Sequence, residues 1–340
     1  MSERIIDIFN HYLPPAFYDK ITELGGNAYM LSRARNMPAM SDINYRLEIM
    51  RRYDGYCQIP CIVSPNVEQV VAPEHTAKLA RFANEEFRRL CDTYPELFPS
   101  FVAVLPLDNM EKAAVEAEYA VKQLGAAGVQ IFTNHRGDPI DTPDFYYLYE
   151  KIAKLDTALW LHPIRTVNDP FYKNDKYSKY ELWWTLLWPV ETGMAIGRLA
   201  YSGLFQKFPD IKVIVHHGGG FIPMMEGRLE YGVQLYTTRT APDMQYLIDS
   251  PIKDKCQIDE FRKFYADCAT FGSRAAIECA LNFYGIDRML FASDMPFDPE
   301  DGSGYIRLTL QNLSDMHLNT EDREKILWKN AVKLLKLPRI

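Results

Sequence analysis

Eight short runs of β-branched and aromatic residues, separated by longer segments with helical spacing, constrain this chain more than any other feature. Segments 76–94, 110–125 and 273–285 place apolar residues three and four positions apart, which is the spacing of amphipathic helices. Repeated strand-then-helix units predict a parallel (β/α)₈ barrel, also called a TIM barrel. The runs that we expect to form strands are 5–11, 55–63, 98–106, 128–133, 157–163, 211–217, 263–269 and 288–294.

The length of 340 residues fits one domain of this class, because such barrels often exceed about 250 residues once they carry insertions. We therefore expect a single domain over residues 1–340. The connection before the seventh strand is longer than a barrel needs over residues 236–260, which predicts an insertion there. Insertions of that kind cover sites or mediate dimers.

Charge and hydropathy exclude several classes of partner. The net charge of −7 argues against nucleic acid, which requires a clustered basic surface. Residues 1–9 have charged side chains and no apolar signal core, so we expect the fold to start directly. The most apolar stretch, 181–205, is interrupted by Pro189, Glu191 and Arg198, and predicts no membrane span. Six cysteines without CxxC pairs favour a reducing cytoplasm, so we expect a cytoplasmic protein with small-molecule partners.

Ligand-type side chains end four of the eight predicted strands. They are His11, His162, the pair His216 and His217, and Asp294. Each alone is more typical of a hydrogen-bonded structural residue. The active site of a barrel gathers at the C-terminal ends of its strands, so together they indicate one catalytic or metal site.

Strand periodicity predicts which of these side chains share one face of a strand. The two-residue period puts Asp7, Phe9 and His11 on one face, where two histidines could reach one ion but Phe9 cannot ligate. By the same period only one of His216 and His217 faces the barrel interior. The residues alone do not decide which.

Several stretches in order resemble the branch of the amidohydrolase superfamily that includes aminocarboxymuconate-semialdehyde decarboxylase and the γ-resorcylate-type decarboxylases. Their order and spacing carry the resemblance, and they span nearly the whole chain. They are IDIFNHYLPP near the start, LHP at 161–163, the stretch from WPVETG to GGGFIP at 188–223, ASDMPFDP at 292–299 and ILWKNAVKLLKL at 326–337.

The resemblance implies roles for individual residues. It makes His11, His162 and Asp294 the ligands of one divalent metal ion, with zinc expected first and manganese or magnesium as alternatives. It makes His217 the acid/base histidine, with Asp294 as a second catalytic group, and leaves His216 as a packed, backbone-bonded residue. Homodimers are common in the family, so we expect a homodimer.

Two residues beyond the ligand set receive substrate-binding roles. Arg46 lies near where the family places an arginine for a substrate carboxylate, although a structural ion pair is an equal alternative. Phe9 stands where the family has His or Glu, and we interpret it as an apolar wall against an aromatic substrate. Its presence leaves two imidazoles and a carboxylate, which matches three-ligand catalytic zinc sites. The alternative is a site without metal, in which His162, His217 and Asp294 form an organic acid/base cluster.

The implied activity is non-oxidative decarboxylation of a small aromatic or conjugated carboxylic acid. The alternative is a hydrolase or hydratase acting on a lactone, amide or C–C bond of a related cyclic substrate, in which Asp294 takes a proton from bound water. A non-catalytic binding barrel is a third hypothesis, with Phe9 in its favour. HGGG at 217–220 is also typical of esterase oxyanion loops, but the chain has no G-x-S-x-G elbow. The aromatic segment 170–189 predicts either a lid or a subunit interface.

Overall fold

The computed structural model describes the chain except for residues 1–2, 27–30, 32–33, 35, 253–256 and 338–340. All eight predicted strands are present, each shorter than the apolar run that contains it. The paired strands run parallel, with β1 paired to β2, and with β3 to β8 each paired to the next in the sequence. The strands are β1 (Ile5–Asp7), β2 (Tyr56–Gln58), β3 (Val102–Ala103), β4 (Gly128–Phe132), β5 (Ala158–His162), β6 (Lys212–Val215), β7 (Tyr265–Asp267) and β8 (Met289–Leu290).

Backbone hydrogen bonds close the strands into a barrel. The ladders form two groups, β1–β2 and β3 to β8. Val102 N donates to Pro60 O at 3.0 Å and joins the second strand segment to the third. Ile8 N donates to Phe291 O at 3.0 Å and joins the first to the eighth. The predicted (β/α)₈ barrel is confirmed.

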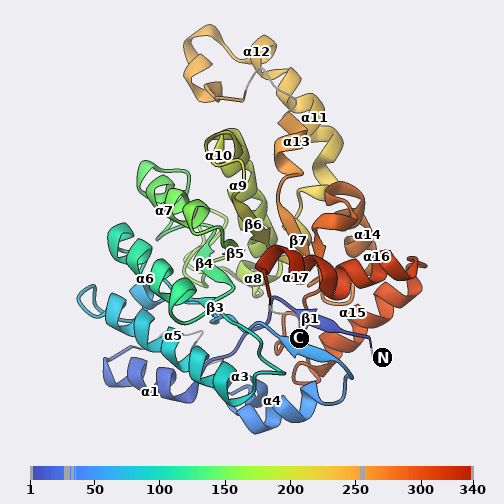
Figure 1. The fold of residues 1–340 in the computed structure, drawn as a ribbon. Helices are drawn as coiled ribbons and strands as arrows, with labels where there is room; N and C mark the ends of the chain where they lie inside the picture. The colour runs from blue at the N-terminus through green and yellow to red at the C-terminus, as the bar shows by residue number, and fades with distance from the viewer. Residues whose placement is uncertain (1–2, 27–30, 32–33, 35, 253–256, 338–340) are drawn as a thin grey trace.

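Helices between the strands cover the outside of the barrel (Figure 1). Their amphipathic faces explain this position: in α5, Leu79, Ala83, Phe87 and Leu90 are buried at three-and-four spacing. The helices of the first half are α1 (Pro15–Glu23), α3 (Pro38–Ser41), α4 (Ile43–Met50), α5 (Thr76–Thr93), α6 (Met110–Lys122) and α7 (Pro143–Lys154). Those of the second half are α8 (Leu182–Thr185), α9 (Leu187–Tyr201), α10 (Leu204–Lys207), α11 (Glu226–Gln234), α12 (Tyr236–Arg239), α13 (Gln257–Phe261), α14 (Arg274–Tyr284), α15 (Ser303–Asp315), α16 (Thr320–Glu324) and α17 (Asn330–Leu335).

Shorter helical turns complete the connections. One of them, η2, directly follows β6 and matters for the site. The turns are η1 (Val67–Gln69), η2 (His217–Gly219), η3 (Pro223–Met225), η4 (Pro242–Ile248), η5 (Ile286–Arg288) and the π-helical η6 (Lys325–Lys329).

The barrel interior is a packed core. Trp160 on β5 is fully buried, and its indole Nε1 donates to the carbonyl of Ile8 at 2.8 Å. That bond joins β5 to the segment after β1 across the interior. Packing of this kind fixes where the strand ends point, and therefore fixes the side chains that extend from them.

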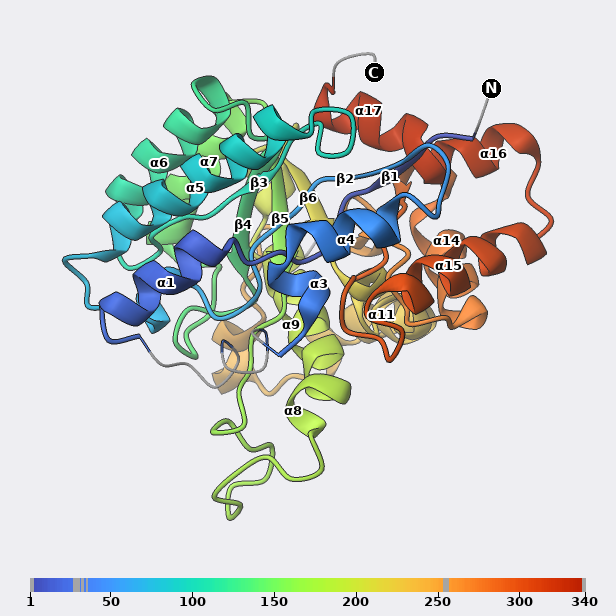
Figure 2. The same cartoon turned by 90° about the horizontal axis from the view of Figure 1, so that it is seen from below.

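Two segments extend from the barrel. The connection after β6 carries α11, α12 and η4 as an arm, seen in Figure 1, and this arm includes the insertion predicted before the seventh strand. The loop between β5 and α8 projects on another side, as Figure 2 shows. Within the described part of the chain, every helix is too short or too polar to cross a bilayer.

Candidate active site

Four strand ends bring their polar side chains to one buried point. His11 follows β1, His162 ends β5, His216 follows β6 and Asp294 follows β8. His11 Nε2 lies 3.1 Å from Asp294 Oδ1, and His216 Nε2 lies 3.3 Å from the same oxygen. One ligand-type nitrogen from each of the three histidines lies within 4.8 Å of the others. The convergence predicted from the strand ends is therefore present.

Hydrogen bonds at Nδ1 orient all three imidazole rings. Each Nδ1 faces an oxygen that can only accept, so Nδ1 carries the proton and Nε2 is the nitrogen available to a ligand or a second proton. The acceptors are the Ile62 carbonyl at 3.2 Å for His11, the Pro163 carbonyl at 2.6 Å for His162, and Asp267 Oδ2 at 2.5 Å for His216.

The contact between His11 and Asp294 tests whether the site fits a cation. His11 Nε2 is buried and makes no hydrogen bond with any residue that the structure describes, although Asp294 Oδ1 is only 3.1 Å away. A bare imidazole nitrogen and a carboxylate oxygen repel each other at this distance in a buried site. A cation between them removes the repulsion, and this nitrogen–oxygen donor set suits divalent zinc or manganese. The residues therefore fit a metal ion.

Electrostatics indicate the same demand for positive charge. Burial opposes ionisation of Asp294, but the neighbouring histidines, His216 first, hold its pKa well below the ordinary value. Burial also acts to lower the pKa of His216, but the Asp267 and Asp294 carboxylates raise it to about 9. Burial and the nearby His11 keep the pKa of His162 well below its ordinary value. When no other cation is present, the Asp267 and Asp294 carboxylates thus favour a second proton on the His216 ring, which makes it an imidazolium.

The β6 end departs from strand alternation. β6 ends at Val215, and His217 already has a left-handed φ of 56°, at the start of η2. This turn brings His217 to the same side as His216, with Nε2 3.5 Å from Asp294 Oδ2. The expectation that only one of the two histidines faces the site is wrong. His216 is also not backbone-bonded as expected, because its ring nitrogens contact two carboxylates.

The glycines after His217 make this turn possible. Gly219 and Gly220 both have positive φ. A Cβ at Gly219 would lie 2.2 Å from the Tyr284 hydroxyl, and one at Gly220 would lie 2.3 Å from the Pro189 carbonyl. Only glycine fits these positions.

Phe9 lies beneath the histidines. Its ring is fully buried and stacks on the His216 imidazole, with centroids 3.7 Å apart and planes 8° apart. It is not among the residues that line the pocket above. The predicted role of an apolar wall against substrate therefore has no support in the geometry.

Arg46 is also outside the pocket. Its guanidinium is fully buried and donates to the His11 carbonyl at 2.7 Å, to Asn10 Oδ1 at 2.6 Å and to Gln58 Oε1 at 2.8 Å. These contacts support the β1 end. They indicate a structural role and no contact with the pocket, and the acceptors are neutral oxygens instead of the carboxylate of the expected ion pair.

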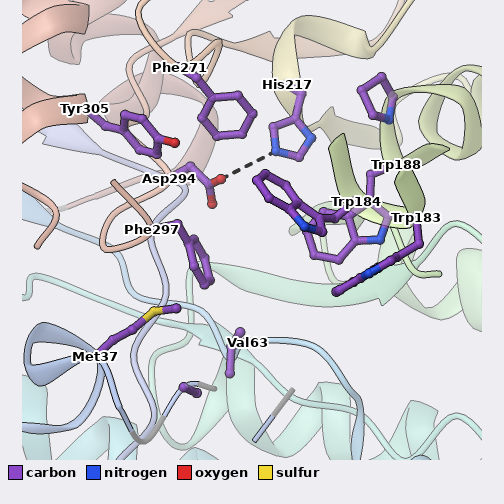
Figure 3. Close-up of a pocket in the computed structure, with 12 residues that line it drawn as sticks. Met37, Val63, Trp183, Trp184, Trp188, His217, Phe271, Asp294, Phe297 and Tyr305 are labelled. Atoms are coloured by element: carbon purple, nitrogen blue, oxygen red, sulfur yellow. Dashed lines mark ion pairs between the residues drawn. The ribbon is translucent and has the colours of Figure 1, made fainter. Parts of the chain in front are cut away.

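An aromatic pocket, drawn in Figure 3, has Asp294 of the buried cluster and His217 in its lining. His217 and Asp294 contribute an imidazole and a carboxylate to it, and neither ring nitrogen of His217 has a hydrogen-bond partner among the described residues. No lysine or arginine is among the described residues of the wall. The pocket thus suits a flat apolar body whose polar end meets the cluster. The other lining residues are Ala34, Met37, Val63, Trp183, Trp184, Trp188, Pro189, Phe271, Phe297 and Tyr305.

Sequence reasoning missed two functional contributions. Three tryptophans of the wall come from the end of the aromatic segment predicted as a lid or interface, and the run ELWWTLLWP was the signal. The second is Asp267, which ends the strand next to β6 and accepts a hydrogen bond from His216 Nδ1. Cys268 is buried, and this burial raises the pKa of its thiol well above the ordinary value.

A family comparison accounts for this constellation. Residues 63–337 match the family model described as Amidohydrolase, which is most of the chain. The chain belongs to this family. The curated relatives of this amidohydrolase include 2-amino-3-carboxymuconate-6-semialdehyde decarboxylase of Dictyostelium discoideum, 27% identical over 87% of this chain and 77% of the relative. They also include γ-resorcylate decarboxylase of a Polaromonas species, 28% identical over 86% of this chain and 87% of the relative.

Solved structures agree with the fold of this amidohydrolase. 5-Carboxyvanillate decarboxylase from Sphingomonas paucimobilis superposes with a TM-score of 0.81 at 22% identity, covering 99% of this chain and all of that one. Dihydroxybenzoic acid decarboxylase from Polaromonas sp. JS666 gives 0.78 at 25% identity, covering 100% of this chain and 98% of that one. The latter structure contains manganese and the inhibitor 2-nitroresorcinol.

Proposed function

We propose that this amidohydrolase is a metal-dependent, non-oxidative decarboxylase of a small aromatic or conjugated carboxylic acid. The observation that carries the proposal is the position of the buried histidine–aspartate cluster, at the floor of an aromatic pocket that has His217 in its wall. Named relatives that decarboxylate aromatic and muconate acids support the same reaction.

His11, His162 and Asp294 would hold one divalent ion. Zinc was the first expectation, and the manganese in a solved neighbour makes manganese an equal candidate. When bound, such an ion supplies an electrophile that stabilises negative charge on substrate oxygens. An ion held there would also attract the carboxylate of a substrate.

The chain's own residues orient the substrate and move the proton. The tryptophan-rich wall stacks on the ring and excludes water from the reacting carbon. The C–CO₂ bond breaks, CO₂ leaves, and a C–H bond forms at the same carbon with a proton from His217 Nε2. Burial and the nearby His216 lower the pKa of His217, so once it is protonated beside an anionic substrate it donates readily.

Substrate trials with the metal-loaded protein test this function. We expect CO₂ release from one or more members of a set of hydroxybenzoates and conjugated enoic carboxylates, with loss of release in His217→Gln. A control, His75→Gln, should keep the activity, since the half-buried His75 precedes α5 and does not line the pocket. Incorporation of oxygen from labelled water into the product without CO₂ would contradict the proposal and indicate a hydrolase.

We also propose a homodimer. Phe171, Tyr172 and Tyr180 in the projecting loop are 64%, 68% and 86% exposed. Large aromatic side chains at such exposure are typical of a surface that a partner covers. Light scattering should give twice the chain mass of 39.3 kDa, and a single-chain mass would contradict this proposal.

Cysteine usage supports a cytoplasmic location. Cys57, Cys61, Cys91 and Cys268 are buried free thiols, and Cys279 is partly buried and also free. Free thiols persist in reducing compartments. Imaging of a fluorescent fusion checks the location, and secretion into the medium would contradict it.

A further inference from the structure

We propose that His216 is a metal ligand of this chain and supplies from the β6 end the ligand that Phe9 cannot supply from the β1 end. This inference rests on the metal-binding part of the proposed function and is independent of which reaction the site catalyses. The ligand set would then be His11, His162, His216 and Asp294. His217 would remain free for proton transfer.

Position is the first argument for His216. Two groups of side chains in the described structure are close enough to hold an ion: one contains His11 and His162, and the other contains His217 and Asp294. His216 belongs to both. Its Nε2 lies 3.3 Å from Asp294 Oδ1, the same oxygen that His11 Nε2 approaches at 3.1 Å. Two imidazole nitrogens thus approach one carboxylate oxygen, and His162 is grouped with both of these histidines.

Support from the surrounding residues is the second argument. His216 Nδ1 donates to Asp267, and metal-bound histidines characteristically donate the other ring nitrogen to a carboxylate or carbonyl. The Asp267 carboxylate is itself held, because Oδ1 accepts from the backbone nitrogens of Gly218 and Ala269, both at 3.1 Å. The ring is therefore oriented with Nε2 toward the cluster.

The third argument explains Phe9. Its ring lies flat against the His216 ring and 6.0 and 5.9 Å from the rings of His11 and His162. A phenyl group there fills the volume of a lost ligand and also fixes the plane of the imidazole that replaces it. Phe9 is thus a positioning residue for His216.

His217, the neighbouring residue, is the matched control. It contacts the same carboxylate, but it lines the pocket and has no carboxylate on its other ring nitrogen. A structural role for His216, as a protonated bridge between Asp267 and Asp294, would use the same contacts without any metal. Metal affinity separates the two roles.

The experiment compares wild type, His216→Ala and His217→Ala by metal content and by competition titration with zinc and manganese. We expect the affinity of His216→Ala to fall about 100-fold or more, since loss of an outer support alone costs about 10 to 100-fold. His217→Ala should stay within about threefold of wild type, because in this proposal His217 is neither a ligand nor a hydrogen-bonded support of a ligand. Wild-type affinity in folded His216→Ala, or equal losses in both variants, would overturn the proposal.

Two further measurements, one on the wild type and one on a variant that keeps His216, keep the test decisive if His216→Ala does not fold. X-ray absorption of the zinc-loaded protein should require three imidazoles, and a fit with two would overturn the assignment. Asp267→Asn, which keeps His216, should bind metal about 10 to 100-fold more weakly. These readouts need no substrate, so metal bound through His216 without CO₂ release would contradict the decarboxylase and leave this ligand in place.

Discussion

The end of β1 and the end of β6 meet at the centre of the barrel with opposite departures from strand regularity. The first carries a phenyl group where a ligand would be expected, and the second carries two histidines where alternation predicts one. Phe9 and His216 are 207 positions apart in the sequence, yet their rings stack at 3.7 Å. A ligand set in a barrel is therefore a property of all the converging strand ends. The lack of a ligand at position 9 is therefore compatible with the proposed metal site.

Asp294 joins the two ends, so its removal should have the largest effect. Asp294→Ala takes away the oxygen shared by His11 and His216, and we expect loss of bound metal and a fall in kcat of about 10⁴-fold. Metal analysis and CO₂ assays check this. Asp315→Ala, at an exposed position that ends α15, is the control. Full metal content in Asp294→Ala would contradict the proposal that Asp294 binds the metal together with His11 and His216.

Substitutions of the two histidines after β6 should have different effects on metal content and on kcat. His217→Gln removes the proton donor, so we expect kcat to fall about 10³-fold while metal content stays unchanged. Paired measurements of metal content and kcat check the division of roles. Loss of metal in this variant would show that the pair had been assigned the wrong way round.

Substitution of Arg46 at the β1 end should mainly lower the unfolding free energy. Arg46→Met removes the donors to His11, Asn10 and Gln58 and leaves their buried acceptors unpaired, which we expect to cost about 4 kcal/mol of unfolding free energy. Urea unfolding measures this loss. KM of the surviving folded protein should be within a factor of about two of wild type, because Arg46 does not line the pocket. A large rise in KM with unchanged stability would restore Arg46 as a substrate anchor.

The contribution of Asp7, at the β1 end, to the unfolding free energy should depend on pH. Burial raises the pKa of Asp7 from 3.8 to about 6, even though Ser293, Tyr56 and Phe9 donate hydrogen bonds to it. The folded state therefore keeps a proton that the unfolded state has lost, so this group's contribution to stability decreases as pH rises from about 4 to about 6. Over that window wild type should lose up to about 3 kcal/mol relative to Asp7→Asn. An unchanged difference in unfolding free energy between wild type and Asp7→Asn at pH of about 4 and about 6 would contradict this.

The sequence predicts the barrel and the convergence of the strand ends, because apolar runs and helical spacing are local signals. It fails at β6, since alternation holds only while the strand continues, and the positive φ of His217 ends it. It also cannot tell whether the partner of a buried arginine is a substrate or the protein itself, which is why Arg46 had two interpretations. The pairing of Asp267 with His216 depends on strand register, which no single run contains.

The most direct test of the proposal that His216 supplies the ligand missing at the β1 end is to place a histidine at position 9. In the His216→Ala background, Phe9→His should restore zinc affinity to within about tenfold of wild type, because a histidine at position 9 re-creates the paired imidazoles of the β1 end. Competition titration measures the single and double variants together. Recovery in the double variant is the predicted result. Wild-type affinity already present in His216→Ala, with no change on adding Phe9→His, would contradict the account.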